Sequence, residues 1–529
     1  MSFMSLIFLI FVAVSVAGYY LIPKKFQWIW LLIFSYIYYI SSGIRILFFI
    51  LFSTAVTYAA GVLMHKIDAA AKAGADDNSS DSRNNRESER KLRAKKKKTI
   101  IVLALLLNFG MLAVIKYSNF AITNINMLFG SKIEAVDFLL PLGISFYTFQ
   151  ATGYILDVYW GRCEAELNPL RYALFVSFFP QIMQGPIGRY SRLAHQLYEK
   201  HAFDPVRTEK ALMRIAYGYF KKIIIADGAY YYMAAVFNSY ADYPGVGLLG
   251  VLAYSAELYA DFSGGIDIVI GIAELFGITM DENFRQPFFS ISITDFWHRW
   301  HITLGTWMKD YLFYPISLSG WMGKFGKFCR SKMGKTIGRA LPICIANIIV
   351  FLVVGIWHGP AWHYIFYGLY NGIIIGISGL LAKPFRNWKK ALHITDKTRW
   401  FHIFQIVRTF ILVNISWFFD CSDTLPQAFT MIRNFFTHFD FSPFFTEKLV
   451  VVGNGSLDIT FINLYVVLAA CAVVFTVSVL RERQVDVRSA IIRWPFAFRA
   501  VLYIAVIFAI PMLGHTPSVE GGGFIYANF

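Results

Sequence analysis

Two short segments of the sequence combine aromatic side chains with histidines suited to acid–base chemistry. The first segment, at 295–304, holds His298 and His301, which would share a helix face because they stand three residues apart. The second holds His358 between two apolar runs, which places this histidine at a helix break within or near a membrane. An ionisable side chain there is costly and is a functional candidate. Neutral imidazole can accept a proton from a hydroxyl group at cellular pH, as an acyl transfer requires.

Three interpretations of the histidines remain open at this point. In the first, an imidazole is the general base of an acyl transfer, and a second group polarises the thioester carbonyl. In the second, His298, His301, His358 and His363 converge on a metal ion. A single H-x-x-H pattern without a carboxylate-rich helix gives this little support, and we predict no metal. In the third, hydrogen bonds satisfy the histidines inside a helical bundle.

Other polar residues lie in apolar surroundings. The segment 180–190 contains Gln184, Gly185 and Pro186, and its glycine and proline residues exclude a regular helix. It forms either a re-entrant wall of a reaction chamber or a tight turn at the cytoplasmic face. Asp261 and Asp267 lie in a further apolar run, where they line a tunnel or pair with a buried arginine.

The composition is that of a multi-pass membrane protein. The chain has 529 residues, of which 57% are hydrophobic and 16% charged, and its mean hydropathy is +0.51. Apolar runs of about 20 residues indicate bilayer spans, and such runs recur throughout this sequence. The net charge of +16 comes from basic residues in short loops beside these runs, so it indicates membrane topology and not nucleic-acid binding. We expect apolar segments at 2–22, 28–42, 44–64, 100–116, 138–159, 172–183, 212–231, 247–275, 341–357, 362–381, 401–419, 461–480 and 497–513.

Several of these segments are short or carry glycine and proline. Irregular backbone inside a membrane is tolerated only where protein buries it or where it lines a cavity. We therefore expect one all-α domain over 1–529, with re-entrant helices around a pore or funnel. The polar stretch 65–98 ends in a basic run and predicts a flexible cytoplasmic loop, which orients the chain and attracts anionic lipids or provides a docking site.

Charge bias predicts the topology of the second half. The basic stretches at 324–339, 383–390 and 481–493 are expected in the cytoplasm, and the acid-tilted stretch 420–458 outside. The first apolar segment has no charge ahead of it, and Lys24 and Lys25 follow it. Both termini, including the tail 514–529, are therefore expected on the extracytoplasmic face of the plasma or inner membrane.

Several motifs together resemble the membrane-bound O-acyltransferase family. They are the opening apolar span followed by Pro23, the run PLGISFYTFQ at 141–150, the run QGPI at 184–187, the stretch from Asp295 to Tyr311, and GIWHG at 355–359. The combination is specific and is similar to the bacterial branch that contains the alginate O-acetylation transferase and the teichoic acid D-alanyl transfer protein. Members of this family form a ring of helices around a thin centre, where a cytoplasmic funnel meets an external one.

The resemblance implies roles for individual residues. His358 is at the position of the family's essential histidine and His301 at that of a second, supporting one, whereas His298 stands where relatives are expected to carry Arg or Asn. The residues expected to line the substrate tunnel are Trp297, Trp300, Trp357, Gln184, Gly185, Pro186 and Asp310.

The last residues resemble a terminal aromatic motif of envelope acylation systems. Tyr526 follows three consecutive glycines, which give the tail reach. A phenol accepts an acyl group once a base takes its proton, so Tyr526 is a candidate relay between His358 and a partner enzyme. The alternative is an aromatic anchor at the membrane interface.

These observations predict an O-acyltransferase without a bound cofactor. We expect it to move an acetyl group from a cytoplasmic thioester, acetyl-CoA, to an envelope polysaccharide or exopolysaccharide, with an extracytoplasmic partner that resembles a serine hydrolase. One alternative is D-alanyl transfer to teichoic acid from an acyl carrier protein. Another is a transporter or channel, since buried polar groups and re-entrant segments occur there too, but that class predicts internal repeats, which the sequence lacks.

Overall fold

The computed structural model describes residues 1, 3–77, 83–138, 141, 143–238, 240–241, 244–395, 398–438 and 461–514. Throughout these residues the chain is helical apart from loops and one isolated antiparallel bridge, between Phe284 and Trp300. The predicted all-α class is therefore confirmed, whereas a ring around a central funnel remains a prediction.

Six helices of the described residues are long and apolar enough to cross a membrane. A bent pair of helices, Trp362–Leu380 and Ala382–Ala391, meets at 57° and raises the number to seven if it is one span. The six spans lie at Ile44–Lys72, Glu87–Phe129, Gly320–His358, Arg399–Cys421, Leu464–Glu482 and Phe496–Leu513. A multi-pass membrane protein is thus confirmed, while the side on which each terminus lies stays a prediction.

The chain divides into two compact units. Unit 1 comprises Met1–Ala211 with Val269–Asp281, and unit 2 comprises Leu212–Ile268 with Glu282–Phe529. Two helices contribute to both units, namely α9 (Pro205–Phe220) and α11 (Gly247–Leu275).

Unit 1 is arranged around α5 (Ile144–Tyr159), which is buried along nearly its whole length. A helix that is buried on all sides is apolar around its whole circumference. The sequence of α5 fits this description, with small and hydroxyl residues between its apolar ones. The other helices of unit 1 are α1 (Leu6–Leu21), α2 (Gln27–Ile40), α3 (Leu47–Asp77), α4 (Arg83–Phe129), α6 (Pro169–Ser177), α7 (Phe179–Gln184) and α8 (Tyr190–Tyr198).

The prediction of a flexible loop at 65–98 was wrong for most of that stretch. Helix α3 continues to Asp77 and α4 begins at Arg83, so only 78–82 lie outside the described residues. Two features of the sequence and one contact of the folded chain explain these helices. The run 69–75 is rich in alanine, the best helix former. Residues 87–93 carry two Glu-to-basic pairs spaced four apart, and an ion pair from Lys97 to Asp68 joins the two helices.

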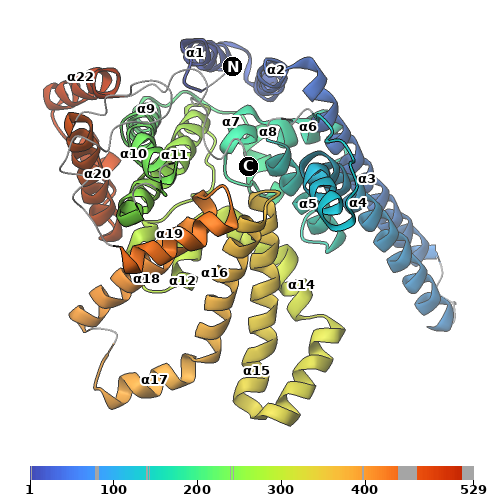
Figure 1. Ribbon diagram of the computed structural model, residues 1–529. Coiled ribbons are helices and arrows are strands. Elements are labelled where there is room, and N and C mark those ends of the chain that lie inside the picture. Colours follow the sequence, from blue (N-terminus) through green and yellow to red (C-terminus); the bar gives the residue numbers. More distant parts are fainter. Residues whose placement is uncertain are drawn as a thin grey trace. The chain divides into compact units, whose positions relative to one another are not determined.

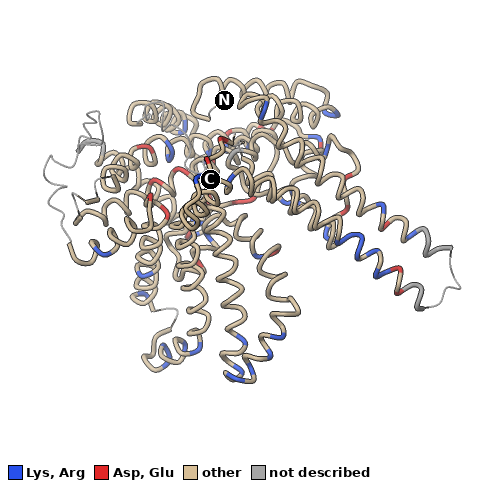
Figure 2. Tube along the Cα trace, turned by 45° about the vertical axis from the view of Figure 1, so that its right-hand side comes forward, with Lys and Arg blue, Asp and Glu red and all other residues tan. Residues whose placement is uncertain are grey.

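Unit 2 contains the segments with the candidate histidines. Its helices are η3 (Lys221–Ala226, a π-helix), α10 (Asp227–Asn238), α12 (Ile293–Arg299), α13 (Ile302–Met308), η6 (Lys309–Phe313, a π-helix), α14 (Tyr314–Ser317), α15 (Gly320–His358), α16 (Trp362–Leu380), α17 (Ala382–Ala391), α18 (Arg399–Cys421), α19 (Leu425–Thr437), α20 (Phe461–Glu482), α21 (Val487–Ile492) and α22 (Phe496–Leu513). Figure 2 shows Lys and Arg in groups, with long stretches of helix between them that carry neither. Helix α17 carries four basic residues along its ten positions, namely Lys383, Arg386, Lys389 and Lys390.

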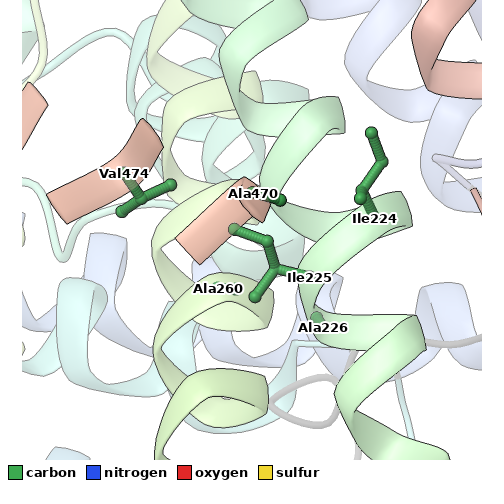
Figure 3. Close-up of a cluster of buried hydrophobic side chains, with 6 residues drawn as sticks. All are labelled: Ile224, Ile225, Ala226, Ala260, Ala470 and Val474. Carbon is green, nitrogen blue, oxygen red and sulfur yellow. The ribbon is translucent and has the colours of Figure 1, made fainter. Parts of the chain in front are cut away.

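Two kinds of contact hold η3 to its neighbours. On one side small and aliphatic residues pack together with α11 and α20 (Figure 3); they are Ile224, Ile225, Ala226, Ala260, Ala470 and Val474. In addition, two buried lysines of η3 reach carboxylates of α11. Lys222 contacts Asp261 at 2.7 Å and Lys221 contacts Asp267 at 2.7 Å. Asp267 also pairs with Arg214, at 2.8 Å.

This pairing confirms the expected buried arginine partner for Asp267, whereas the partner of Asp261 is a lysine. Breaking a buried ion pair costs about 3–5 kcal/mol because it leaves a charge uncompensated. Asp261 and Asp267 are paired with cations and hold helices together, so neither needs a place in a tunnel.

Glycines bring α15 and α16 into close contact, side by side in Figure 1. A Cβ atom at Gly368 would meet the Phe351 carbonyl oxygen and the Cα of Gly355, and one at Gly372 would lie 3.0 Å from the Cα of Ile348. Small residues four apart let membrane helices approach to backbone contact. The two helices form an antiparallel hairpin whose turn begins at Gly359, directly after His358.

Enlarging Gly368 should separate this hairpin. We expect Gly368→Leu to lower stability by about 1–3 kcal/mol or more, since overpacking displaces backbone, and to inactivate the protein by moving His358. Gly379→Leu is the matched control, because a Cβ at this position of the same helix meets nothing within 4 Å. Thermal unfolding in detergent measures both, and equal melting temperatures for the two variants would contradict the packing described.

Candidate active site

His358 is the last residue of α15 and is 3% exposed. Gly359 follows it with extended backbone, and α16 begins at Trp362. A Cβ at Gly359 would overlap the ring of Tyr364, so the turn passes directly beneath that ring. The predicted helix break at His358 is therefore confirmed.

Aromatic rings surround the His358 imidazole. The ring centroids of Trp357 and Tyr367 lie 5.1 Å and 4.8 Å from it, both in edge-on orientation. The ring of Tyr364 lies 6.1 Å away. These rings exclude water and fix the imidazole plane.

A buried carboxylate faces one nitrogen of this ring. The Oδ1 atom of Asp420, from the last turn of α18, lies 3.2 Å from Nδ1 of His358, and the two side chains are 1% and 3% exposed. The pair is within ion-pair distance but is out of line for a hydrogen bond. The hydroxyl group of Tyr254 donates to Oδ2 of the same carboxylate at 2.9 Å.

His301 is held in a strained turn between α12 and α13. Its φ of 47° lies in the left-handed region, which is uncommon for a residue other than glycine. The side-chain oxygen of Asn283 accepts from the backbone N–H and the hydroxyl of Thr303 and lies 3.1 Å from Nδ1 of His301. Because that oxygen can only accept, Nδ1 of His301 carries the hydrogen and Nε2 the lone pair.

Burial, together with the nearby His358, lowers the pKa of His301 to about 3. The ring is thus neutral at cellular pH. The indole of Trp357 joins the two histidines, with its ring centroid 5.8 Å from His301 and 5.1 Å from His358. The structure therefore brings His301, Trp357 and His358 together.

The expectation that His298 and His301 share a helix face was wrong. Helix α12 ends at Arg299, and the bridge between Phe284 and Trp300 draws the chain away from helical geometry. As a result His298 is exposed while His301 is 2% exposed. Pairing with a distant segment is not visible in a local spacing pattern.

The other expected tunnel residues of unit 2 differ in their surroundings. The indole N–H of Trp297 donates to Asn371 at 3.2 Å, and this side chain is half-buried. Trp300 is 1% exposed and packs in an aromatic cluster with Phe296 and Trp417. Asp310 is half-buried in the π-helix η6.

The segment with Gln184, Gly185 and Pro186 belongs to unit 1. Helix α7 ends at Gln184, as the glycine and proline predicted, and the side chain of Gln181 donates to the carbonyl of Pro186 at 2.9 Å. Gln184 is 1% exposed, and neither atom of its amide has a hydrogen-bond partner in the described part of the chain. A role for this segment in a tunnel stays a prediction.

The remaining candidates divide clearly. His363 contacts the carbonyl of Phe419 through Nδ1 at 2.8 Å, which is the structural role considered for it. Tyr526 lies outside the described residues. Among the described residues no three His, Cys, Asp or Glu side chains are grouped as metal ligands.

Sequence reasoning missed Asp420, Tyr254 and Asn283. Asp420 was assigned to an acidic external stretch, although it ends an apolar run and so met the criterion for a functional ionisable residue in a membrane segment. Tyr254 and Asn283 contact the site only through folding, and no local pattern distinguishes them.

Comparison with known proteins supports a common family. Residues 164–416 match the model of the MBOAT, membrane-bound O-acyltransferase family. The chain is 32% identical to a probable alginate O-acetylase of Pseudomonas aeruginosa over 443 residues, which are 83% of this chain and 75% of the relative. It is 31% identical to a peptidoglycan O-acetyltransferase of Helicobacter pylori, over 63% of each chain. It is 33% identical to a teichoic acid D-alanyltransferase of Bacillus subtilis, over 51% of this chain and 66% of the relative.

The Asn283 side chain should control how accessible His301 is. We expect Asn283→Ala to free the strained turn, because three contacts end on its oxygen, and so to increase modification of His301 by diethylpyrocarbonate. Peptide mass spectrometry measures this. His298, which is exposed, is the internal control and should react equally in both proteins. Unchanged protection of His301 would contradict the role given to Asn283.

Proposed function

Because this chain belongs to the membrane-bound O-acyltransferase family, we propose that it transfers an acetyl group from a thioester donor to a hydroxyl group of a cell-envelope polysaccharide or exopolysaccharide. The donor would bind from the cytoplasmic side and the acceptor from the extracytoplasmic side. Family membership favours this enzyme over the transporter alternative.

The names of the relatives support acetyl transfer to a polysaccharide. The alginate O-acetylase aligns over 83% of this chain, and the teichoic acid D-alanyltransferase over 51%. The longer alignment favours an acetyl group as the one transferred, and we propose acetyl-CoA as its donor. D-alanyl transfer from an acyl carrier protein remains the second candidate because the identity is similar, at 33%.

The observation that carries the proposal is a buried histidine at a helix break, beside a second, neutral histidine. In the proposed reaction Nε2 of His358 takes the proton of the acceptor hydroxyl as its oxygen bonds to the thioester carbonyl carbon. The resulting tetrahedral intermediate collapses, the carbon–sulfur bond breaks, and the proton passes from Nε2 to the leaving thiolate. Ester and thiol are the products, with no net proton released.

The tautomer of His301 limits its part in this reaction. Because Nδ1 carries the hydrogen and faces Asn283, the neutral ring can accept a hydrogen bond only at Nε2. It is therefore suited to orient a hydroxyl or thiol donor group of a substrate, and unsuited to donate to an oxyanion. The donor that polarises the carbonyl would be another group.

A partner completes the proposed pathway. An extracytoplasmic enzyme that resembles a serine hydrolase would place the acyl group on the polymer, and Tyr526 would carry it there from His358. Both termini would then lie outside the cytoplasm.

Purified protein and radiolabelled acetyl-CoA test the donor and the base together. With Tyr526 as the acceptor hydroxyl, we expect covalent label on the wild type and none on His358→Ala, since the base is lost, whereas His298→Ala should label as the wild type does. Label on His358→Ala would refute His358 as base. Absence of label on the wild type, with label appearing from an acylated carrier protein, would show that the D-alanyl-type alternative is correct.

The relay is tested separately in cells. Tyr526→Phe keeps an aromatic ring at the tail but removes the hydroxyl that would accept the acyl group. We expect acetylation of the envelope polymer, measured by base-released acetate, to fall to background. Wild-type acetylation in this variant would leave the tail as a membrane anchor.

A further inference from the structure

The carboxylate of Asp420 lies on one side of His358. Asp420 lies in the last turn of α18, and His358 ends α15. The Oδ1 atom of Asp420 faces Nδ1 of the imidazole at 3.2 Å. A buried carboxylate therefore lies at the Nδ1 side of the ring.

The position of this carboxylate is fixed from two directions. The Tyr254 hydroxyl, on α11, binds Oδ2 at 2.9 Å, which leaves Oδ1 directed at His358. One residue earlier, the carbonyl of Phe419 contacts Nδ1 of His363 at 2.8 Å, which ties the backbone of α18 to α16. Both Tyr254 and Asp420 are at most 4% exposed.

Burying a carboxylate is costly when few hydrogen bonds compensate its charge, and a nearby cation lowers this cost. The other ionisable groups close to His358 are His301, which is neutral, and the phenols of Tyr254, Tyr364 and Tyr367. Near Asp420 lie Cys421, Asp423 and Glu257, none of which is a cation, and His363, whose Nδ1 is already engaged by the carbonyl of Phe419. The imidazolium of His358 is thus the cation this carboxylate is placed to meet.

From this geometry we infer that Asp420 is a positioning residue that stabilises the imidazolium of His358 during acyl transfer, and that Tyr254 orients Asp420. The inference rests on the proposed function. As Nε2 takes the hydroxyl proton, the positive charge on the ring is balanced by Asp420. When Nε2 returns the proton to the thiolate, the ring becomes neutral and Asp420 is unchanged. The carboxylate contacts neither substrate.

The Asp420→Asn variant removes the negative charge of the side chain and keeps its shape. Asp420→Asn has nearly the same size, and its carbonyl oxygen still accepts from Tyr254, so a purely structural role would survive. We expect it to lower kcat by about 10²- to 10⁴-fold, the range for loss of general-base function and its carboxylate support, with little change in KM. Binding of a non-reactive thioether analogue of acetyl-CoA and the melting temperature should match the wild type.

Two further variants complete the test. Asp420→Glu keeps the charge and should recover part of kcat. Tyr254→Phe removes one hydrogen bond but not the charge, and we expect a loss of about tenfold or less. An Asp420→Asn enzyme with at least half the wild-type kcat would overturn the inference. So would a loss that appears equally in analogue binding and melting temperature, since that describes a structural residue.

His358→Gln distinguishes this inference from the proposed function. If His358→Gln is inactive while Asp420→Asn is fully active, His358 remains the base and only the role of Asp420 falls. If His358→Gln transfers the acetyl group at the wild-type rate, the proposed function of His358 falls, and the inference about Asp420 falls with it.

Discussion

The backbone contact between α15 and α16 is the constraint on which the site depends. His358 occupies a defined place only because α15 stops there and the chain reverses within three residues. A reversal that tight needs two helices at backbone distance, and the glycines at 355, 368 and 372 provide it. In a membrane, where lipid is as apolar as a leucine side chain, such packing replaces the hydrophobic effect as the force between helices. The position of His358 is therefore a consequence of glycine spacing far along both helices.

Burial acts differently on the two histidines because their polar neighbours differ. His301 faces an amide oxygen that is fixed by Thr303, and burial keeps its ring neutral. Nδ1 of His358 faces the carboxylate of Asp420 instead. The proposed roles follow from this difference: one ring would accept a hydrogen bond and the other would take a proton. In the sequence the two histidines have similar aromatic neighbours. They differ in the polar residues that contact them only in the folded chain, Asn283 for His301 and Asp420 for His358.

Local patterns predicted the helices well and their irregularities poorly. The apolar run at 247–275 coincides with α11, and the glycine after His358 marked the end of α15. The break at His301 escaped prediction because a bridge to Phe284 causes it, and the helical ends of the stretch 65–98 escaped because its polar composition outweighed its alanine content. The candidate histidines at 301 and 358 could be proposed from their motifs, and their contact through Trp357 became visible only in the fold. Tyr254 and Asn283 could not be proposed in this way, since each acts through a contact distant in sequence.

Two other buried carboxylates of unit 2, Asp261 and Asp267, have partners of a different kind from those of Asp420. Asp267 has two cationic partners, Arg214 and Lys221, at 2.8 Å and 2.7 Å, and Asp261 has Lys222. Such carboxylates are compensated permanently, which suits a joint between helices. Asp420 has a tyrosine hydroxyl and a histidine nitrogen, so its compensation becomes complete only when that nitrogen's ring is protonated. A carboxylate whose partner is a cation for part of a reaction cycle stabilises that part most, and this differential stabilisation is what lowers a barrier.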